Sequence, residues 1–210
     1  MKMNSSTTTR ASRKHKAILQ AATAVFLQKG YDGASMDDVA ATARVSKPTV
    51  YKHFTDKERL FAAVVSATTD DVNELVRLAC ITLEDDGDVE AHLTRLARQF
   101  LTALMQPRLL DLRRMVIANA GRFPNVGRTW YEQGFGRALT TLANSFQQLA
   151  VRKALRLDDA ALAANHFVGL LLWIPVNKAM FSGDHETSEA SLNRYAKAAV
   201  RAFLTGYGAR

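Results

Sequence analysis

The sequence predicts an all-α protein of about nine helices, with a small N-terminal domain and a larger C-terminal one. Only 4 prolines and 11 glycines interrupt the 210 residues, whereas alanine and leucine, both good helix formers, are abundant. Apolar residues recur at intervals of three and four, which is the period of an amphipathic helix. With 48% hydrophobic and 23% charged residues, the composition is that of a globular protein.

The first helix is predicted from Arg13 to Lys29, where apolar residues follow the helical period. Gly30 suits the left-handed residue that ends many helices, and Tyr31 can fold back as its apolar partner. Residues 1–12 are polar and rich in serine and threonine, so we expect them to form a flexible arm.

Two short helices are predicted next, each opened by a serine. Ser35 can cap the first, with Asp38 in its first turn. Ser46 can cap the second, Lys47–His53, in the same way, and Pro48 sits in its first turn. The very tight connection between them is typical of a helix-turn-helix, which places its second helix in the major groove of DNA.

The second short helix has little room for core residues beyond Val50 and Phe54, so its other side chains face outward. They are Lys47, Thr49, Tyr51, Lys52 and His53. Hydroxyl groups and cations on one helix suit bases and phosphates, although Tyr51 can instead be partly buried between helices. Lys57, in the first turn of the next helix, can hold a phosphate together with free N–H groups.

The charge distribution agrees with a DNA partner. Residues 1–60 carry 11 Lys and Arg against 5 Asp and Glu, whereas the remaining 150 residues carry 17 against 15. A basic first quarter is expected of a segment that faces a polyanion, and a solubilising surface is the alternative. Arg10, Arg13 and Lys14 in or beside the arm either reach the minor groove or backbone or remain solvated.

The run A-R-V-S-K-P-T-V-Y-K-H-F-T-D-K-E-R-L-F, residues 43–61, resembles the signature of the tetracycline-repressor (TetR) family. Residues 17–40 are similar to the family's first two helices. The resemblance implies an all-α homodimer with a DNA-binding head and a ligand-binding body. By position, it implies DNA contacts at Thr49, Tyr51, Lys52 and His53 and phosphate contacts at Lys47 and Lys57.

One position departs from the family pattern. Many members have glycine where this chain has Arg44, at the end of the second helix. A left-handed conformation there costs arginine about 1 kcal/mol relative to glycine. Arg44 either compensates by reaching a phosphate or simply faces solvent.

The organisation is predicted as a flexible arm (1–12), a helix-turn-helix domain (13–60) and a helical ligand-binding and dimerisation domain (61–210). After a fourth helix that Thr55 or Asp56 caps and that ends near Leu83, further helices are predicted at about 89–105, 109–120, 128–153, 158–181 and 188–206. Pro175 is expected to kink the helix at 158–181 or to end it early.

Aromatic and sulfur-bearing residues of the body, interleaved with arginines, predict an apolar effector pocket. The candidate lining residues are Phe100, Leu104, Met115, Phe123, Trp130, Tyr131, Phe135, Phe167 and Trp173. The alternative is that they only fill the core. Residues 108–156 carry 9 Lys and Arg against 2 Asp and Glu, so one arginine can pair with an anionic ligand. Residues 122–131 and 157–167 resemble AefR-like members of the family, which are often linked to efflux or stress genes.

The helix at 158–181 is apolar nearly all round, so it needs a partner on each side. Together with the last helix it suits a two-fold four-helix interface, and an internal helix of a monomer is the alternative. The predicted interface residues are Leu170, Ile174, Leu192, Tyr195, Ala199 and Phe203.

Neither an enzyme nor a metal or cofactor site is predicted. The five histidines are scattered, the single cysteine, Cys80, suits a packed side chain, and no nucleophile stands beside a base. The first ten residues lack the apolar core of a signal peptide, and the apolar stretch 167–176 is too short to span a membrane, so we expect a cytoplasmic protein.

The prediction is a ligand-responsive repressor that binds a palindromic double-stranded DNA operator as a homodimer and is released by a small apolar or amphipathic effector. The alternative is a ligand-independent DNA-binding module that acts through a protein partner.

Overall fold

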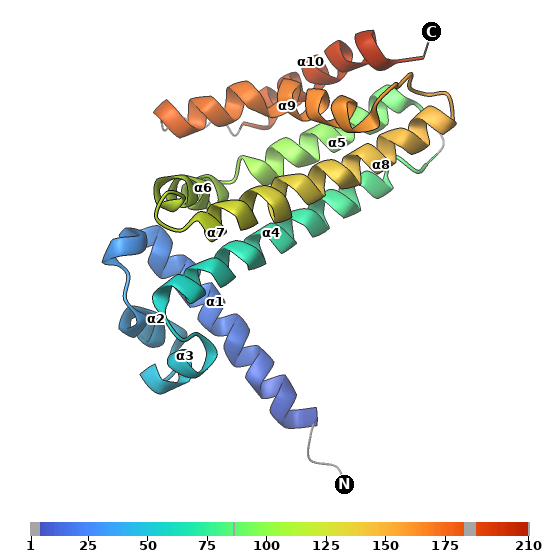
Figure 1. Cartoon of the computed structure of the whole chain (residues 1–210). Coiled ribbons are helices and arrows are strands. Elements are labelled where there is room, and N and C mark those ends of the chain that lie inside the picture. Colours follow the sequence, from blue (N-terminus) through green and yellow to red (C-terminus); the bar gives the residue numbers. More distant parts are fainter. Residues whose placement is uncertain (1–4, 86, 183–187, 210) are drawn as a thin grey trace. The chain divides into compact units, whose positions relative to one another are not determined.

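The computed structural model describes residues 5–85, 87–182 and 188–209, and nearly all of them belong to helices (Figure 1). The only pairing of extended residues in these ranges is an isolated bridge between Leu155 and Gly208. The all-α fold predicted from the sequence is confirmed.

The chain divides into two compact units. The first, which we call the head, comprises Met1–Thr68 and Met115–Trp130, and the second, the body, comprises Thr69–Arg114 and Tyr131–Arg210. The head therefore takes in a later segment that the sequence assigned to the body.

Seven elements contribute to the head. They are α1 (Ser5–Gly33), α2 (Met36–Ala43), α3 (Lys47–His53), the first half of α4 (Lys57–Ile81), the end of α6 (Pro107–Asn119), α7 (Pro124–Arg128) and the first two residues of η1 (Thr129–Gly136). Residues 5–12, predicted as a flexible arm, are instead the first turns of α1, and residues 1–4 lie outside the described residues.

An aromatic cluster forms the centre of the head. Phe26 and Phe61 are fully buried, and their rings meet edge-on at 5.3 Å. Gly30 breaks the geometry of α1 with φ at 70°, as predicted, and this turn lets Tyr31 stack on Phe26 at 6.0 Å. Tyr31 also contacts Phe123 at 4.8 Å, so the α6–α7 connection packs against the end of α1.

The body contains the rest of α4 and α6 together with α5 (Val89–Leu104), α8 (Arg137–Val151), α9 (Ala160–Ser182) and α10 (Glu189–Tyr207). Phe146, Phe167 and Phe203, one from each of the last three helices, are buried and lie 5.1–5.5 Å apart. This aromatic triad fixes the packing of α8, α9 and α10.

One predicted helix is divided in the structure, and one expected interruption does not end its helix. The helix expected at 128–153 is divided into the end of α7, a π-helix η1 (Thr129–Gly136) and α8. In η1, Gly134 permits close approach to α4, because a Cβ at this position would lie 3.1 Å from Cγ2 of Thr69. Pro175 does not end α9, which continues to Ser182.

Among the described helices, α9 is long and apolar enough to cross a bilayer by length and composition. This evidence is weak, because core helices of globular proteins pass the same test. Ala163, Phe167 and Leu171 of α9 are fully buried in the body, as in such a core helix.

Candidate functional site

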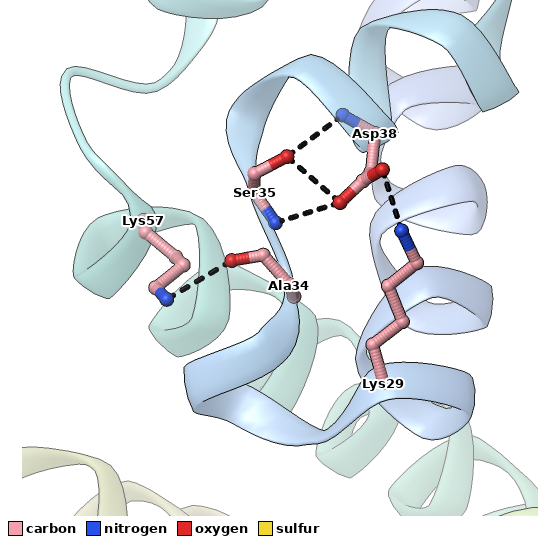
Figure 2. Close-up of polar contacts among 5 residues, drawn as sticks. All are labelled: Lys29, Ala34, Ser35, Asp38 and Lys57. Atoms are coloured by element: carbon pink, nitrogen blue, oxygen red, sulfur yellow. Dashed lines mark hydrogen bonds and ion pairs between the residues drawn. The ribbon is translucent and has the colours of Figure 1, made fainter.

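The start of α2 is fixed by a reciprocal cap, shown in Figure 2. The Oγ of Ser35 accepts a hydrogen bond from the backbone N–H of Asp38 at 3.1 Å, and the Asp38 carboxylate accepts one from the N–H of Ser35 at 3.1 Å. Lys29 of α1 donates to the same carboxylate at 2.6 Å. The bonds from Lys29 and then Ser35 lower the pKa of Asp38, so the carboxylate stays charged and ties α2 to α1.

The turn between α2 and α3 depends on Arg44, which adopts the left-handed conformation predicted for it, with φ at 54° and ψ at 44°. Its backbone N–H donates to the carbonyl of Ala41, and the next N–H, that of Val45, donates to Ala40. The Arg44 side chain is exposed and has no ion pair with any described residue. It is therefore available to an external anion.

The helix α3 presents its predicted inward and outward sides. Val50 is fully buried and Phe54 is buried beside it, whereas Tyr51 is 44% exposed and Lys52 is exposed. Thr49 is half-buried, and its Oγ1 lies 2.8 Å from the Oγ of Ser46. The Ser46 side chain makes no capping hydrogen bond, so the prediction that it caps α3 as Ser35 caps α2 is wrong.

The ammonium of Lys47 lies 2.8 Å from the carboxylate of Asp37 on α2. The hydrogen bond and charge of Asp37 raise the pKa of Lys47. Both side chains are more than half exposed, and exposed pairs of this kind contribute at most about 1 kcal/mol. A DNA phosphate can therefore replace Asp37 as the partner of Lys47 at little cost.

The ammonium of Lys57 has other partners than predicted. Its Nζ donates to the carbonyls of Tyr31 at 2.8 Å, Asp32 at 3.3 Å and Ala34 at 3.0 Å, the last of which is drawn in Figure 2. The ammonium also lies 4.6 Å from the centre of the Tyr31 ring. All three of its donors are thus used within the head, which corrects the prediction that this ammonium binds a phosphate.

His53, at the end of α3, is half-buried near two other rings. Its ring centre lies 5.6 Å from that of His15 on α1, which in turn lies 5.0 Å from that of Phe54. Burial lowers the pKa of His53, and the charges of His15, Lys52 and Lys14 lower it further. The imidazole is therefore held neutral beside a cationic surface, where a phosphate would favour its protonation.

Sequence reasoning missed the contacts around Asp32. Arg122 Nη1 lies 2.8 Å from its carboxylate, and the guanidinium lies 5.5 Å from the Tyr31 ring and 5.0 Å from the Phe123 ring. No local signal links residues 90 positions apart. Phe123, predicted to line an effector pocket, is instead a buried neighbour of Tyr31 in the head.

The other predicted pocket residues are divided between the two units. Met115 and Trp130 belong to the head, whereas Phe100, Leu104, Tyr131, Phe135, Phe167 and Trp173 belong to the body. Within the body, Tyr131 is 69% exposed and Trp173 is 68% exposed, so both point to solvent and leave the predicted lining. Phe167 fills the aromatic triad, and the apolar pocket beside Phe100 and Leu104 holds only about 10 Å³.

Arg113 is the arginine of the body that best fits an internal anion. Its guanidinium lies 5.2 Å from the ring of Phe135, and burial lowers its pKa. It forms no ion pair with a described residue. A cation held on an aromatic face in a partly desolvated place favours an anionic partner.

The predicted interface residues fall into two groups. Leu170 and Ile174 of α9 are exposed, and Tyr195 of α10 is half-buried. The other three, Leu192, Ala199 and Phe203, are buried in the body's own core. They have no surface for a second copy to cover, so their assignment to an interface is corrected.

Cys80 is buried, and burial raises the pKa of its thiol, which therefore stays protonated. In the part of the chain that the structure describes, no group of three or more His, Cys, Asp and Glu side chains is placed to hold a metal ion.

Comparisons with known proteins agree with this geometry. Residues 18–64 match the family model described as bacterial regulatory proteins of the tetR family. Residues 91–209 match the C-terminal domain of AefR-like transcriptional repressors.

Among curated proteins, the chain is 42% identical over 69 residues to the transcriptional activator FasR of Mycolicibacterium smegmatis, which covers 33% of this chain and 32% of FasR. It is 37% identical over 93 residues to the transcriptional regulator YdeS of Bacillus subtilis, which covers 42% of each. The chain thus matches less than half the length of these curated relatives.

Solved structures are similar over more of the chain. A TetR-family transcriptional regulator of Mesorhizobium loti is 50% identical, with a TM-score of 0.92 over 95% of this chain and 98% of that one. The flavonoid-responsive regulator FrrA is 28% identical, with a TM-score of 0.70 over 95% and 99%.

Proposed function

The chain belongs to the TetR family of bacterial transcriptional regulators, and from this premise we propose that it is a cytoplasmic, ligand-responsive repressor that binds a palindromic operator as a homodimer. The observation that carries the proposal is the outward side of α3. Tyr51 and Lys52 are exposed on that side, whereas Val50 on the opposite side is buried and α2 is fixed by its cap.

DNA recognition divides between two kinds of side chain. Tyr51, with Thr49, is suited to base edges, because hydroxyl groups both donate and accept. Arg44, Lys47 and Lys52 are suited to phosphates on either side of the groove. Two copies of such a head bind half-sites about 34–36 Å apart, which requires a palindromic site.

Footprinting on the DNA that flanks the gene tests this function. We expect a symmetric protected site, and Tyr51→Ala should weaken operator binding about tenfold or more while the protein remains a dimer. Only weak binding that is indifferent to sequence would contradict the repressor, and loss of the dimer in Tyr51→Ala would assign Tyr51 a structural role.

The proposed homodimer rests on α9, which exposes several large apolar side chains between Leu162 and Phe181. Its exposed large apolar residues are Leu162, Leu170, Trp173, Ile174 and Phe181. We call these five residues the apolar stripe of α9. Large apolar side chains gathered on one exposed helix face are a common mark of a subunit interface, and a two-fold axis would place this stripe against its own copy.

Trp173→Glu, which places a charge in this stripe, should convert the dimer to a monomer in sedimentation velocity. The control is Val151→Glu, a matched change at an exposed apolar residue of α8. A dimer that tolerates Trp173→Glu as well as Val151→Glu would move the interface away from α9.

The effector is proposed to be small and amphipathic, with an anionic group. The guanidinium of Arg113 on the Phe135 ring offers a cation for that group and an aromatic surface for the apolar part. FrrA, the flavonoid-responsive regulator that is 28% identical over 95% of this chain, supports an aromatic effector. Binding in the body then shifts the population toward a conformation that no longer fits the operator.

Operator release is the measurement, with the flavonoid naringenin and the fatty acid oleate as probes. We expect one of them to release the wild-type protein, and Arg113→Ala to require a higher concentration of it. Arg108→Ala, at an exposed arginine of the same helix, is the control. If neither probe binds the body or releases the operator, the alternative of a ligand-independent module with a protein partner is favoured.

A further inference from the structure

The body has a groove whose lining residues take part in neither the proposed DNA contacts nor the proposed effector site. It lies between α5 and α10, which run antiparallel in Figure 1, and it has a volume of about 770 Å³. We call it the α5–α10 groove. Its lining residues are Asp88, Glu90, Ala91, Thr94, Arg95, Arg98, Asn193, Lys197 and Arg201.

Four of these residues are cations, Arg95 and Arg98 from α5 and Lys197 and Arg201 from α10. All four are exposed, and none forms an ion pair with a described residue, although seven such pairs are found elsewhere in the described chain. Like charges gathered in one hollow repel one another, and a bound anion removes that repulsion.

Two carboxylates also line the groove, so its formal charge is +2, from four cations and two anions. They differ in what they can offer a ligand. Asp88 caps α5 by accepting from the backbone N–H of Glu90 at 2.9 Å, whereas the Glu90 side chain has no ion pair or hydrogen bond with a described residue. Glu90 is therefore a free acceptor in an otherwise cationic groove.

We propose that the α5–α10 groove binds a small ligand that carries two or more phosphate groups, of the size of a nucleotide. Its volume falls within the range of about 300–1,000 Å³ typical of small-molecule sites. Arginine forks bind phosphate oxygens in pairs, and lysine adds a point charge. Thr94 and Asn193 supply neutral donors, and Glu90 accepts from the hydroxyl or amino groups of a nucleoside.

Two other occupants are disfavoured by the same charges. A second copy of the chain, placed by a two-fold axis on this groove, would bring four cations against four cations. The apolar stripe of α9 serves that contact better. Duplex DNA is an extended polyanion that suits a basic stripe or helix rather than a hollow.

Isothermal titration calorimetry of the full-length protein tests the site, with sodium tripolyphosphate and magnesium-free ATP as probes at physiological ionic strength. The variant Arg98→Ala/Lys197→Ala removes one cation from each wall. We expect it to weaken binding at least about tenfold, because it removes two charge-assisted contacts. The control, Arg108→Ala/Arg152→Ala, removes two exposed arginines of the body from outside the groove and should bind as the wild type does.

A further variant separates the two sources of phosphate. Glu90→Gln raises the charge of the groove from +2 to +3, so tripolyphosphate binding should become somewhat stronger. If the ligand is a nucleotide, ATP binding should weaken relative to tripolyphosphate binding, because the acceptor for the nucleoside is lost. If the ligand is an inorganic oligophosphate, both probes should gain equally and the site stands.

Three results would overturn the proposal: no binding of either probe, equal weakening in the control variant, or binding of random-sequence duplex DNA that the groove variant loses. Operator binding should be unchanged in all three variants, because the groove lies in the body, so failure of this site remains distinct from failure of the repressor.

Discussion

The head and the body use their charged side chains differently. In the head, Lys29 is held by Asp38, Lys47 by Asp37 and Lys57 by three backbone carbonyls. In the body, the four cations of the α5–α10 groove have no such partner among the described residues. These three lysines of the head hold its own helices together, whereas the four cations of the groove remain available to an external anion.

The apolar residues show a similar contrast. The helix-turn-helix is short, and its large apolar side chains turn inward, with Tyr51 as the exposed exception. The body has a closed aromatic triad on one side of α9 and an exposed apolar stripe on the other. The head thus presents mainly polar and charged side chains on α3, whereas the body also presents large apolar side chains, which suit contact with another protein surface.

The largest effect is expected at Phe203, which the sequence placed at an interface and the structure places in the triad. Phe203→Ala should lower the free energy of unfolding by about 3–5 kcal/mol, because it leaves a cavity between three helices. Urea unfolding measures this loss. Phe181→Ala, at a residue of α9 that is 88% exposed, should change the stability little and the dimer more. Equal losses in the two variants would mean that the two sides of α9 are not distinct.

A smaller loss of stability is expected when a lysine that is hydrogen-bonded within the head is replaced, and almost none when an unpaired lysine is replaced. Lys57→Met keeps the aliphatic stem and removes the ammonium, so three carbonyls lose their donor and Tyr31 its cation. We expect the free energy of unfolding to fall by about 2 kcal/mol.

The matched change is Lys52→Met on α3. Lys52 is exposed and forms no ion pair with a described residue, so its loss should alter stability by no more than about 0.5 kcal/mol. It should weaken operator binding and reduce the salt slope by about one. If Lys57→Met instead matched Lys52→Met in both measurements, Lys57 would be a phosphate contact after all.

Sequence predicted the local features of the head well. The cap at Ser35, the turn at Gly30 and the left-handed Arg44 each depend on residues within one or two helical turns. The prediction for Lys57 was wrong because it used only local sequence, in which a lysine at the start of a helix indicates a phosphate site. The carbonyl groups that Lys57 binds belong to residues 23 to 26 positions earlier in the chain.

The body was predicted less well, for a physical reason. The helix α9 is apolar nearly all round, so its period does not identify the side that faces inward. Because α8 and α10 pack on Phe167, Trp173 faces solvent. This packing depends on residues of the other two helices and cannot be predicted from the sequence of α9 alone. The predicted effector residues were scattered for the same reason.

The two serines that open α2 and α3 give a finer test of the head. Ser35→Ala removes an acceptor from the N–H of Asp38 and should cost about 1 kcal/mol of stability. Ser46→Ala removes only a contact with Thr49 and should cost a few tenths of that, by the same urea unfolding. A larger loss for Ser46→Ala would show that α3 is capped by its serine in solution.

The smallest expected effect is a dependence of folding stability and operator affinity on pH, through His53. Burial holds the pKa of His53 below its usual 6.5, with His15, Lys52 and Lys14 lowering it further. Its contribution to folding is therefore complete above pH 6.5 and is lost as the pH falls toward the folded pKa, since the unfolded chain binds the proton more readily.

DNA reverses this sign, because phosphates near α3 favour the protonated imidazole. Operator affinity, measured by fluorescence anisotropy at constant ionic strength, should rise as the pH falls from about 8 to about 6, by a few-fold at most. His53→Gln should flatten the profile, whereas His166→Gln, at an exposed histidine of α9 in the body, should leave it unchanged. A wild-type slope that persists in His53→Gln would assign the proton to another group. Loss of the pH dependence in His53→Gln would show that the half-buried imidazole of His53 takes up the proton when the operator binds.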